Sequence, residues 1–296
     1  MITSGAARRR WPYHAPGFLR FTDPYDHDGS VVHPDVVDTG PAGWNGHRYW
    51  MACTPYYHND FRQENPSVYW ADTPTKWVEA TTNPICPPPA RTSRWNSDPD
   101  LVLDPDTGEM VLLFRDGQFA PHIARSADGV TWPVSPSALR LPGVTEEIVS
   151  PSLLRVGGEW WLWGIAHPSR VMCRWTAPRI EGPWQGPVAC TGWNADAWHF
   201  NVVEHGSRLL CLMHEGWTRG TTFAASSSDG VVWSKNPRPV LVTGRADTWD
   251  SAELYRSALT VHENGAAMRV WYPGRSDTSD SWRLGYTEIP LSEWPA

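Results

Sequence analysis

The chain has no run of apolar residues that approaches the eighteen or so needed to cross a bilayer, so it predicts no membrane-spanning helix. It also lacks a basic stripe. With 25 Lys and Arg against 32 Asp and Glu, the formal net charge is −7, which argues against a nucleic-acid partner. Cysteine is scarce: the five residues are an odd number without the paired spacing of a zinc site. We therefore expect free thiols, no disulfide framework and no cluster that demands a metal ion.

A secretory signal is also missing at the start of the chain. Arg8–Arg10 are followed by Trp11 and Pro12, where a signal peptide would have its apolar core. We expect synthesis in a reducing cytoplasm without export by the general route. Residues 1–17 are predicted to form a flexible arm, a candidate contact for an oligomer or virion partner, and residues 18–296 a single domain.

Tryptophan, glycine and proline are abundant instead. Twenty Trp favour half-buried pleated surfaces, and 24 Gly with 28 Pro supply many turns and argue against a helical bundle. One five-residue pattern recurs five times: a polar residue, a Pro or bulky residue, a small polar residue and two apolar residues. Its copies begin at His33, Asp98, Ser150, His199 and Tyr255. Self-similarity at a spacing of roughly fifty to sixty residues is typical of an array or a propeller. The sequence predicts an all-β fold, a five-bladed β-propeller of four-stranded antiparallel blades, with Phe18–Phe21 as a strand beside the last blade.

Turn signals predict which end of this propeller carries the chemistry. Short turns at 104–108, 157–158 and 264–265 join the first two strands of their blades, and Asp-Gly turns at 128–129 and 229–230 join the last two. These tight turns share one end, which we expect to be structural. The starts of the first strands share the other end with the longer loops between second and third strands, and this end is the candidate active face.

The first strand of each blade is innermost, so its polar residues line the central funnel. The five residues that open the repeats form a first ring. A second ring follows two residues later, on the same side by period-two alternation: Asp35, Asp100, Ser152, Asn201 and Ser257. The second ring has two interpretations, because its members either supply catalytic carboxylates or hydrogen-bond the backbone of neighbouring blades. Further residues of the candidate active face are Glu64, Arg115, Glu147, Trp198 and Arg256.

Carboxylates brought together from separate blades are what glycosidic bond hydrolysis requires, one ionised as base and one protonated as acid. Asp98–Leu101, followed by 104–110, resembles the second-blade motif of glycoside hydrolase family 43, in which an Asp before Pro tunes the acid and positions the substrate. Residues 31–294 also resemble uncharacterised glycosidase-like proteins of actinobacteria and their phages. The motifs that carry this broader resemblance are His33–Val37, Tyr49–Ala52, Glu64–Ser67 and Trp282–Glu288.

The resemblance implies a base and an acid that this chain does not carry at the family's positions. The base's position in blade one is His33 here, and the acid's position in blade three is Val149. We therefore assign Asp35 as the base, Asp98 as the positioning carboxylate and Glu147 as the acid. The predicted substrate contacts are His33, Glu64, Arg115, Trp198, His199, Tyr255 and Arg256. The alternative is that the two histidines are buried and hydrogen-bonded and that Glu147 is a solvated loop residue.

The sequence thus predicts a glycoside hydrolase acting on a polysaccharide, with cell-wall arabinan or a related glycan as its substrate. A rival hypothesis is a glycan-binding protein without activity, for instance a phage tail component, because the family's base and acid are missing. A transferase or phosphorylase on the same scaffold is a third hypothesis. The sequence requires no cofactor, although a structural calcium ion is compatible with the channel, and neither nucleic acid nor membrane is an expected partner.

Overall fold

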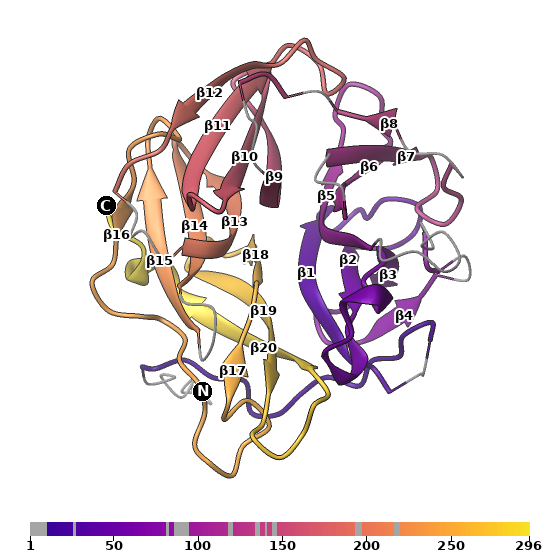
Figure 1. Ribbon diagram of the computed structural model, residues 1–296, viewed down its shortest axis with the longest axis vertical. Helices are drawn as coiled ribbons and strands as arrows, with labels where there is room; N and C mark the ends of the chain where they lie inside the picture. The colour runs from indigo at the N-terminus through magenta and orange to yellow at the C-terminus, as the bar shows by residue number, and fades with distance from the viewer. Residues whose placement is uncertain are drawn as a thin grey trace, which may run out of the picture.

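The computed structural model describes residues 11–25, 28–80, 83–85, 95–117, 121–133, 137–139, 141–143, 147–192, 197–215 and 220–296. Five antiparallel sheets of four strands each are arranged around a central axis, so the predicted five-bladed β-propeller is confirmed (Figure 1). In the described part of the chain, no helix has the length and apolar character needed to span a membrane.

The first four blades are simple meanders in which each strand pairs with the next. Blade one holds β1 (Val31–Asp38), β2 (Tyr49–Pro55), β3 (Ser67–Ala71) and β4 (Trp77–Glu79). Blade two holds β5 (Asn96–Leu103), β6 (Met110–Asp116), β7 (Pro121–Ser126) and β8 (Ser137–Ala138). Blade three holds β9 (Glu147–Val156), β10 (Glu159–His167), β11 (Val171–Ala177) and β12 (Gln185–Ala189). Blade four holds β13 (Ala197–His205), β14 (Arg208–Glu215), β15 (Thr221–Ser227) and β16 (Ser234–Lys235).

Blade five is built differently, because its innermost strand is interrupted. Both β17 (Glu253–Leu254) and β18 (Ala258–Val261) pair with β19 (Ala267–Arg275), and β20 (Arg283–Pro290) follows on the outer side. The gap between β17 and β18 carries Tyr255 and Arg256. Short 3-10 helices at Tyr57–Asn59 (η1), Phe61–Gln63 (η2) and Leu291–Glu293 (η3) complete the described elements.

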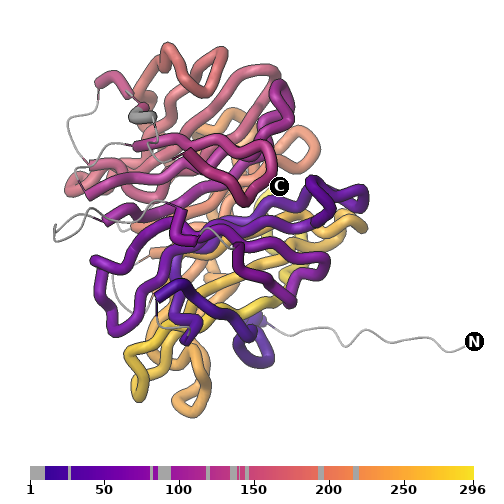
Figure 2. The backbone as a smooth tube through the Cα atoms, turned by 90° about the vertical axis from the view of Figure 1, so that its right-hand side faces the viewer, coloured from indigo at the N-terminus to yellow at the C-terminus, as the bar shows by residue number. Residues whose placement is uncertain are grey.

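The N-terminal segment closes the ring against the C-terminal blade. Phe18 forms a β-bridge with Gly285, and the Leu19 amide donates a 2.7 Å hydrogen bond to the Leu284 carbonyl, as predicted for 18–21. Figures 1 and 2 show the indigo N-terminal chain running beside the yellow C-terminal strands. This contact joins the two ends of the chain in one sheet.

Residues 11–17, assigned to the predicted arm, already pack on blade five. The Tyr13 side chain is buried in the same apolar cluster as Tyr272, and its amide donates to the Val240 carbonyl. The Ala15 amide donates to the Tyr272 hydroxyl at 2.8 Å. The packed chain thus begins by residue 11, and residues 1–10 lie outside the described residues.

Tryptophan side chains lock neighbouring blades together at the Asp-Gly turns. Gly129, at φ +76°, lies against the Trp50 ring of blade one, and an added Cβ would sit 2.2 Å from that ring. Gly230 receives the Trp163 indole N–H on its carbonyl at 2.8 Å. These turns require glycine for two reasons. The backbone is in the left-handed region, and the neighbouring indole ring leaves no space for a side chain.

The second ring joins the innermost strands by hydrogen bonds from blade to blade. Asp35 accepts from the Leu101 amide (2.6 Å) and Asp100 from the Leu153 amide (2.8 Å). The series continues with Ser152 accepting from the Val202 amide (3.2 Å) and Asn201 from the Leu259 amide (3.1 Å). These contacts match the structural interpretation of the second ring, because each side chain satisfies a buried amide of the next blade.

Asn201 is the member of this ring whose loss we expect to cost most. Its Oδ1 accepts from the Leu259 amide, and its Nδ2 donates to Asp35 at 2.6 Å. Asn201→Ala removes the acceptor of the buried Leu259 amide and the donor to Asp35 Oδ1, so the free energy of unfolding should fall by about 3 kcal/mol in urea denaturation. Ser257→Ala is the matched control with an expected change within about 1 kcal/mol, since Ser257 bonds only the nearby Tyr255 carbonyl among the described residues. Equal losses in the two variants would contradict the blade-to-blade assignment.

Candidate functional site

Backbone bulges place the first ring at the mouth of the funnel. His33, Asp98 and Ser150 have φ values of +53°, +52° and +54°, in the left-handed region that non-glycine residues rarely adopt. Each lies beside a register shift in the pairing of the innermost strand with the second strand of its blade. Bulges of this kind re-aim side chains. Period-two alternation did not predict them, because it assumes regular strands.

The bulges bring two imidazoles and one carboxylate together in the funnel. One ligand atom from each of His33, Asp98 and His199 lies within 4.8 Å of the others. The Asp98 Oδ1 atom is 3.2 Å from His33 Nε2 and 3.7 Å from His199 Nδ1. All three side chains are at least 98% buried. We call this group the His-Asp-His triad.

Neighbouring side chains and backbone hold the triad residues in place, and one polar side-chain atom of each triad residue has no hydrogen-bond partner among the described residues. Asp98 Oδ2 accepts from Arg115 Nε (2.6 Å) and from the Ser150 amide (3.2 Å). His199 Nδ1 lies 3.1 Å from the Ser150 hydroxyl. Among the described residues, Asp98 Oδ1 and the Nε2 atoms of His33 and His199 have no hydrogen-bond partner. Buried polar atoms without partners are rare and call for an explanation.

The protonation states of the triad suit a divalent cation. Burial lowers the pKa of His33 to about 3 and holds that of His199 well below its usual value, so both rings are neutral. Burial opposes ionisation of Asp98, but the charge of Arg115 holds its pKa well below the usual value. His33 Nδ1 also lies 3.0 Å from the Thr54 hydroxyl, the second contact that orients metal-binding imidazoles. Two neutral imidazoles and a carboxylate are a zinc-type ligand set.

No metal ligands were predicted from the sequence, because a linear pattern does not reveal which blades bring their side chains together. The three side chains come from three blades and meet only because the ring closes. The available signal was their common repeat position, which the sequence analysis assigned to substrate contacts and a positioning carboxylate.

Charged groups lie around the triad. Arg115 bridges Asp98 and Glu147, and His167 Nδ1 is 3.6 Å from Glu147 Oε2. Two of the three predicted catalytic carboxylates, Asp98 and Glu147, therefore share one guanidinium. Burial raises the pKa of Glu147. Burial also raises the pKa of Glu64 to about 8, opposed by its hydrogen bond with Ser97 and by the Arg115 charge.

Aromatic side chains form one wall of the site. The Tyr255 ring centroid lies 5.0 Å from that of His33 and 4.4 Å from that of His199. The Trp198 indole N–H donates to the Tyr255 hydroxyl at 3.4 Å, and Trp282 packs on the Tyr255 ring at 5.4 Å. Two predicted substrate contacts, Trp198 and Tyr255, thus lie beside the triad, and their polar tips face each other.

Two predicted site residues belong to a different layer of the channel. Asp35 accepts from the Leu101 amide and from Asn201, so both of its oxygens are engaged in the second ring. Arg256 is fully buried and donates to Asp100 Oδ1 (3.3 Å) and the Pro151 carbonyl (3.0 Å). Asp35 as base and Arg256 as substrate contact remain predictions of the sequence that these contacts do not favour.

Comparison with known proteins finds one curated relative and several solved propeller structures that are similar to this chain. No protein-family model matches it. An A type blood N-acetyl-α-D-galactosamine deacetylase of Flavonifractor plautii is 26% identical in an alignment that spans 94% of this chain. The chain spans about half the length of that curated relative, since the alignment covers 48% of it.

Solved structures share the fold at low identity. The crystal structure of an N-acetylgalactosamine deacetylase from F. plautii with blood group B trisaccharide matches with a TM-score of 0.82 and 22% identity, over 95% of this chain and 96% of that one. A GH62 α-L-arabinofuranosidase catalytic domain from Coprinopsis cinerea matches at 0.69 and 12%, over 95% and 97% of the two chains. A thermostable family-43 glycoside hydrolase matches at 0.62 and 11%, over 88% and 89%. These likenesses establish a fold in common with family 43 and family 62 propellers.

The triad predicts a divalent metal site that calorimetry can test. Titration of the chelator-treated protein with Zn²⁺ should show one tight site, and His199→Ala should weaken it by at least roughly a hundredfold because a direct ligand is lost. His205→Ala, which removes the half-buried last residue of β13, is the matched control and should bind like wild type. Unchanged Zn²⁺ affinity in His199→Ala would contradict the site.

The raised pKa of Glu64 predicts a pH-dependent stability of the metal-free protein. A carboxyl whose pKa is higher in the folded chain stabilises the fold below pH about 4.5, and this contribution is lost as pH rises through about 8. Glu64→Gln mimics the neutral form, so its melting temperature should rise relative to wild type between pH 5 and pH 9. Glu159→Gln, an exposed control, should show a constant difference across this range. A constant difference for Glu64→Gln would exclude the raised pKa.

Proposed function

We propose that the protein is a metal-dependent deacetylase that hydrolyses the N-acetyl group of an amino-sugar residue in a glycan. The observation that carries this proposal is the His-Asp-His triad, which occupies the funnel with three unpartnered buried atoms. The 26% identity to an N-acetylgalactosamine deacetylase across 94% of the chain supports the same chemistry.

The ligand set fits a metal ion whose role in amide hydrolysis is well defined. His33, Asp98 and His199 would hold it, and when bound it supplies a Lewis acid for the acetyl carbonyl and lowers the pKa of a coordinated water. Arg115 keeps Asp98 ionised and oriented through its bond to Oδ2. The Nδ1 atoms of both imidazoles lie beside hydroxyls, and their Nε2 atoms have no partner among the described residues.

Two neighbouring side chains are placed for proton transfer and charge stabilisation. Glu64 is buried, and the charge of the nearby Asp98 is among the causes of its raised pKa. In its ionised form it would act as a general base, taking a proton from the attacking water and returning it to the leaving nitrogen. The water oxygen forms the new bond to the acetyl carbon, the C–N bond breaks, and the products are acetate and an amine. Tyr255 stays protonated, because burial raises the pKa of its hydroxyl, and it can donate a hydrogen bond to the developing oxyanion.

Glycosidic bond hydrolysis is the second candidate. Glu64 and Glu147 both have raised pKa values from burial in the funnel, which suits an acid partner. Solved family-43 and family-62 propellers share the fold. Against this candidate, Asp98 is engaged with Arg115 and Ser150, and Asp35 lies in the second ring. Arabinan as the substrate and a binding role in a phage tail stay predictions of the sequence alone.

One assay separates the two functions. The Zn²⁺-loaded protein is incubated with an oligosaccharide that ends in N-acetylgalactosamine, and the products are analysed by mass spectrometry and for free acetate. Deacetylation yields acetate and an amine with the sugar chain intact, whereas a glycosidase yields shorter chains and new reducing ends.

Variants then assign the roles of the site residues. Tyr255→Phe should lower kcat roughly a hundredfold with little change in KM, the effect of removing one oxyanion donor. Glu64→Gln should also lower kcat while leaving Zn²⁺ affinity intact, and Glu159→Gln serves as the control with wild-type kinetics. Reducing ends without acetate release would overturn the deacetylase proposal in favour of the glycosidase.

A further inference from the structure

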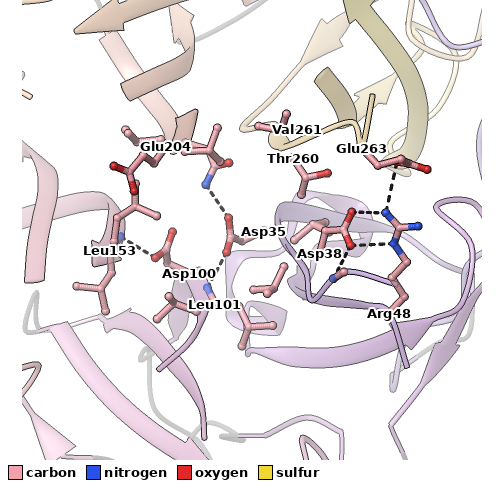
Figure 3. Close-up of a pocket in the computed structure, with 18 of the residues that line it drawn as sticks. Asp35, Asp38, Arg48, Asp100, Leu101, Leu153, Glu204, Thr260, Val261 and Glu263 are labelled. Carbon is pink, nitrogen blue, oxygen red and sulfur yellow. Dashed lines mark hydrogen bonds and ion pairs between the residues drawn. The ribbon is translucent and has the colours of Figure 1, made fainter. Parts of the chain in front are cut away.

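The turn end of the channel lacks the surface that a sugar ring needs. A cavity of about 400 Å³ lies there, lined by the C-terminal halves of the innermost strands, and none of the described residues that line it is aromatic (Figure 3). Arg48 donates to Asp38 at 2.9 Å and to Glu263 at 3.3 Å. Asp35 and Asp100 accept hydrogen bonds from neighbouring amides. Further contacts with a glycan therefore have to come from the opposite end, the mouth of the funnel.

Two aromatic side chains meet at the funnel mouth. Phe61 belongs to η2, in the loop between β2 and β3, and Trp95 directly precedes β5. Their ring centroids are 4.9 Å apart at an interplanar angle of 72°, which is an edge-to-face contact. Trp95 is half-buried, whereas Phe61 is 44% exposed, so the Phe61 ring stays accessible beyond this contact. We call these two residues the mouth pair.

The mouth pair lies one step outward from Glu64. The Glu64 amide donates to the Phe61 carbonyl at 3.0 Å and closes a 3-10 turn. Residues three apart eclipse in such a turn, so Phe61 lies on the same side as Glu64, about 6 Å further along the axis. On the neighbouring segment, Trp95 and Ser97 share a face by period-two alternation, and Ser97 hydrogen-bonds Glu64. The two rings therefore continue outward the wall that Glu64 and Ser97 begin.

Hydrogen bonds hold the two segments of the mouth pair in this arrangement. The Asn96 amide donates to the Glu64 carbonyl at 2.9 Å, and Asn96 Nδ2 donates to Asn65 Oδ1 at 3.2 Å. The Gly117 amide donates to the Trp95 carbonyl at 2.7 Å. Gly117 also leaves room for the indole, since an added Cβ would lie 3.1 Å from it. A surface that is already ordered loses little conformational entropy when a ligand binds.

A different set of aromatic side chains borders the triad itself. The Tyr255 ring centroid lies 5.0 Å from that of His33, and Trp282 packs on Tyr255 at 5.4 Å. Under the proposed function, the sugar whose acetyl group reaches the triad lies against this wall. The mouth pair lies further out, on the side of Glu64, where the next ring of a glycan would pass. The accessible Phe61 ring is flat and apolar, and it matches the apolar C–H face of a pyranose.

We propose that the mouth pair is a second sugar subsite, which binds the residue to which the N-acetylated sugar is attached. This inference rests on the proposed function, because it takes the triad as the place of the reacting acetyl group. The apolar face of the second ring stacks on Phe61, and Trp95 holds the Phe61 ring from the side. The protein therefore binds a glycan of two or more residues more tightly than a single sugar.

Calorimetry with two glycosides tests the subsite without turnover. The full chain carries Glu64→Gln, is loaded with Zn²⁺, and is titrated with the disaccharide N-acetylgalactosaminyl-galactose. The methyl glycoside of N-acetylgalactosamine, which lacks the second ring, is titrated in parallel. The disaccharide should bind roughly tenfold more tightly, the effect of one aromatic stacking contact. Adding Phe61→Ala should remove this difference and leave the affinity for the methyl glycoside unchanged.

Further variants separate stacking from apolarity and from folding. Phe61→Tyr keeps the flat ring and should retain the preference for the disaccharide, whereas Phe61→Leu should lose it. Phe18→Ala is the matched control, because Phe18 is a 52% exposed phenylalanine that bridges to Gly285 in blade five. It should show the same preference as the protein with Phe18 intact. The melting temperature of each variant checks that the fold is retained.

Kinetics distinguish this subsite from the deacetylase function. In the protein with Glu64 intact, Phe61→Ala should raise KM for the disaccharide roughly tenfold without changing kcat, as expected when uniform binding is lost. Equal affinity for the two glycosides with Phe61 present, a preference that survives Phe61→Ala, or equal weakening of both glycosides by Phe61→Ala would each overturn the subsite. A preference that depends on Phe61 without acetate release from either glycoside would reject the deacetylase function and still support the subsite.

Discussion

The hydrogen bonds between the innermost strands are the constraint on which the rest of this propeller depends. In the second ring, one polar side chain per blade satisfies a backbone amide of the next blade, from Asp35 through Asp100 and Ser152 to Asn201. An unpaired amide at the centre of the disc would be costly, since water is largely excluded there. These bonds therefore set the relative height of the blades, and the height of the blades decides which side chains meet in the funnel.

Bulges in the innermost strands of blades one to three distinguish the first ring from the second ring. His33, Asp98 and Ser150 of the first ring lie at bulges of their strands, whereas the second-ring residues Asp35 and Asp100 accept hydrogen bonds from neighbouring backbone. Left-handed φ values at His33 and Asp98 carry a local cost in backbone energy. The surrounding sheet holds this geometry in place, and the result is a compact set of ligand atoms at the channel mouth.

Two buried arginines form ion pairs with different carboxylates of the channel. Arg115 pairs with Asp98 and Glu147 on the funnel side, and Arg256 pairs with Asp100 near the turn end. Each guanidinium keeps its carboxylates from repelling one another in a region that water hardly reaches. This division leaves the His-Asp-His triad beside one guanidinium and the second ring beside the other.

The sequence by itself determined the five-fold repeat, the turns and the closing contact of 18–21, because repeat period, Asp-Gly turns and aromatic strands are local signals. It also placed Asp98, Glu64, Arg115 and Glu147 at one face. Only the tertiary structure decided the partners of these residues. The His-Asp-His triad depends on bulges and on ring closure that bring three blades together, and the engagement of Asp35 depends on the height of the neighbouring strand. Hydrogen-bond partners and ligand geometry are set by contacts between distant segments, which a linear pattern does not encode.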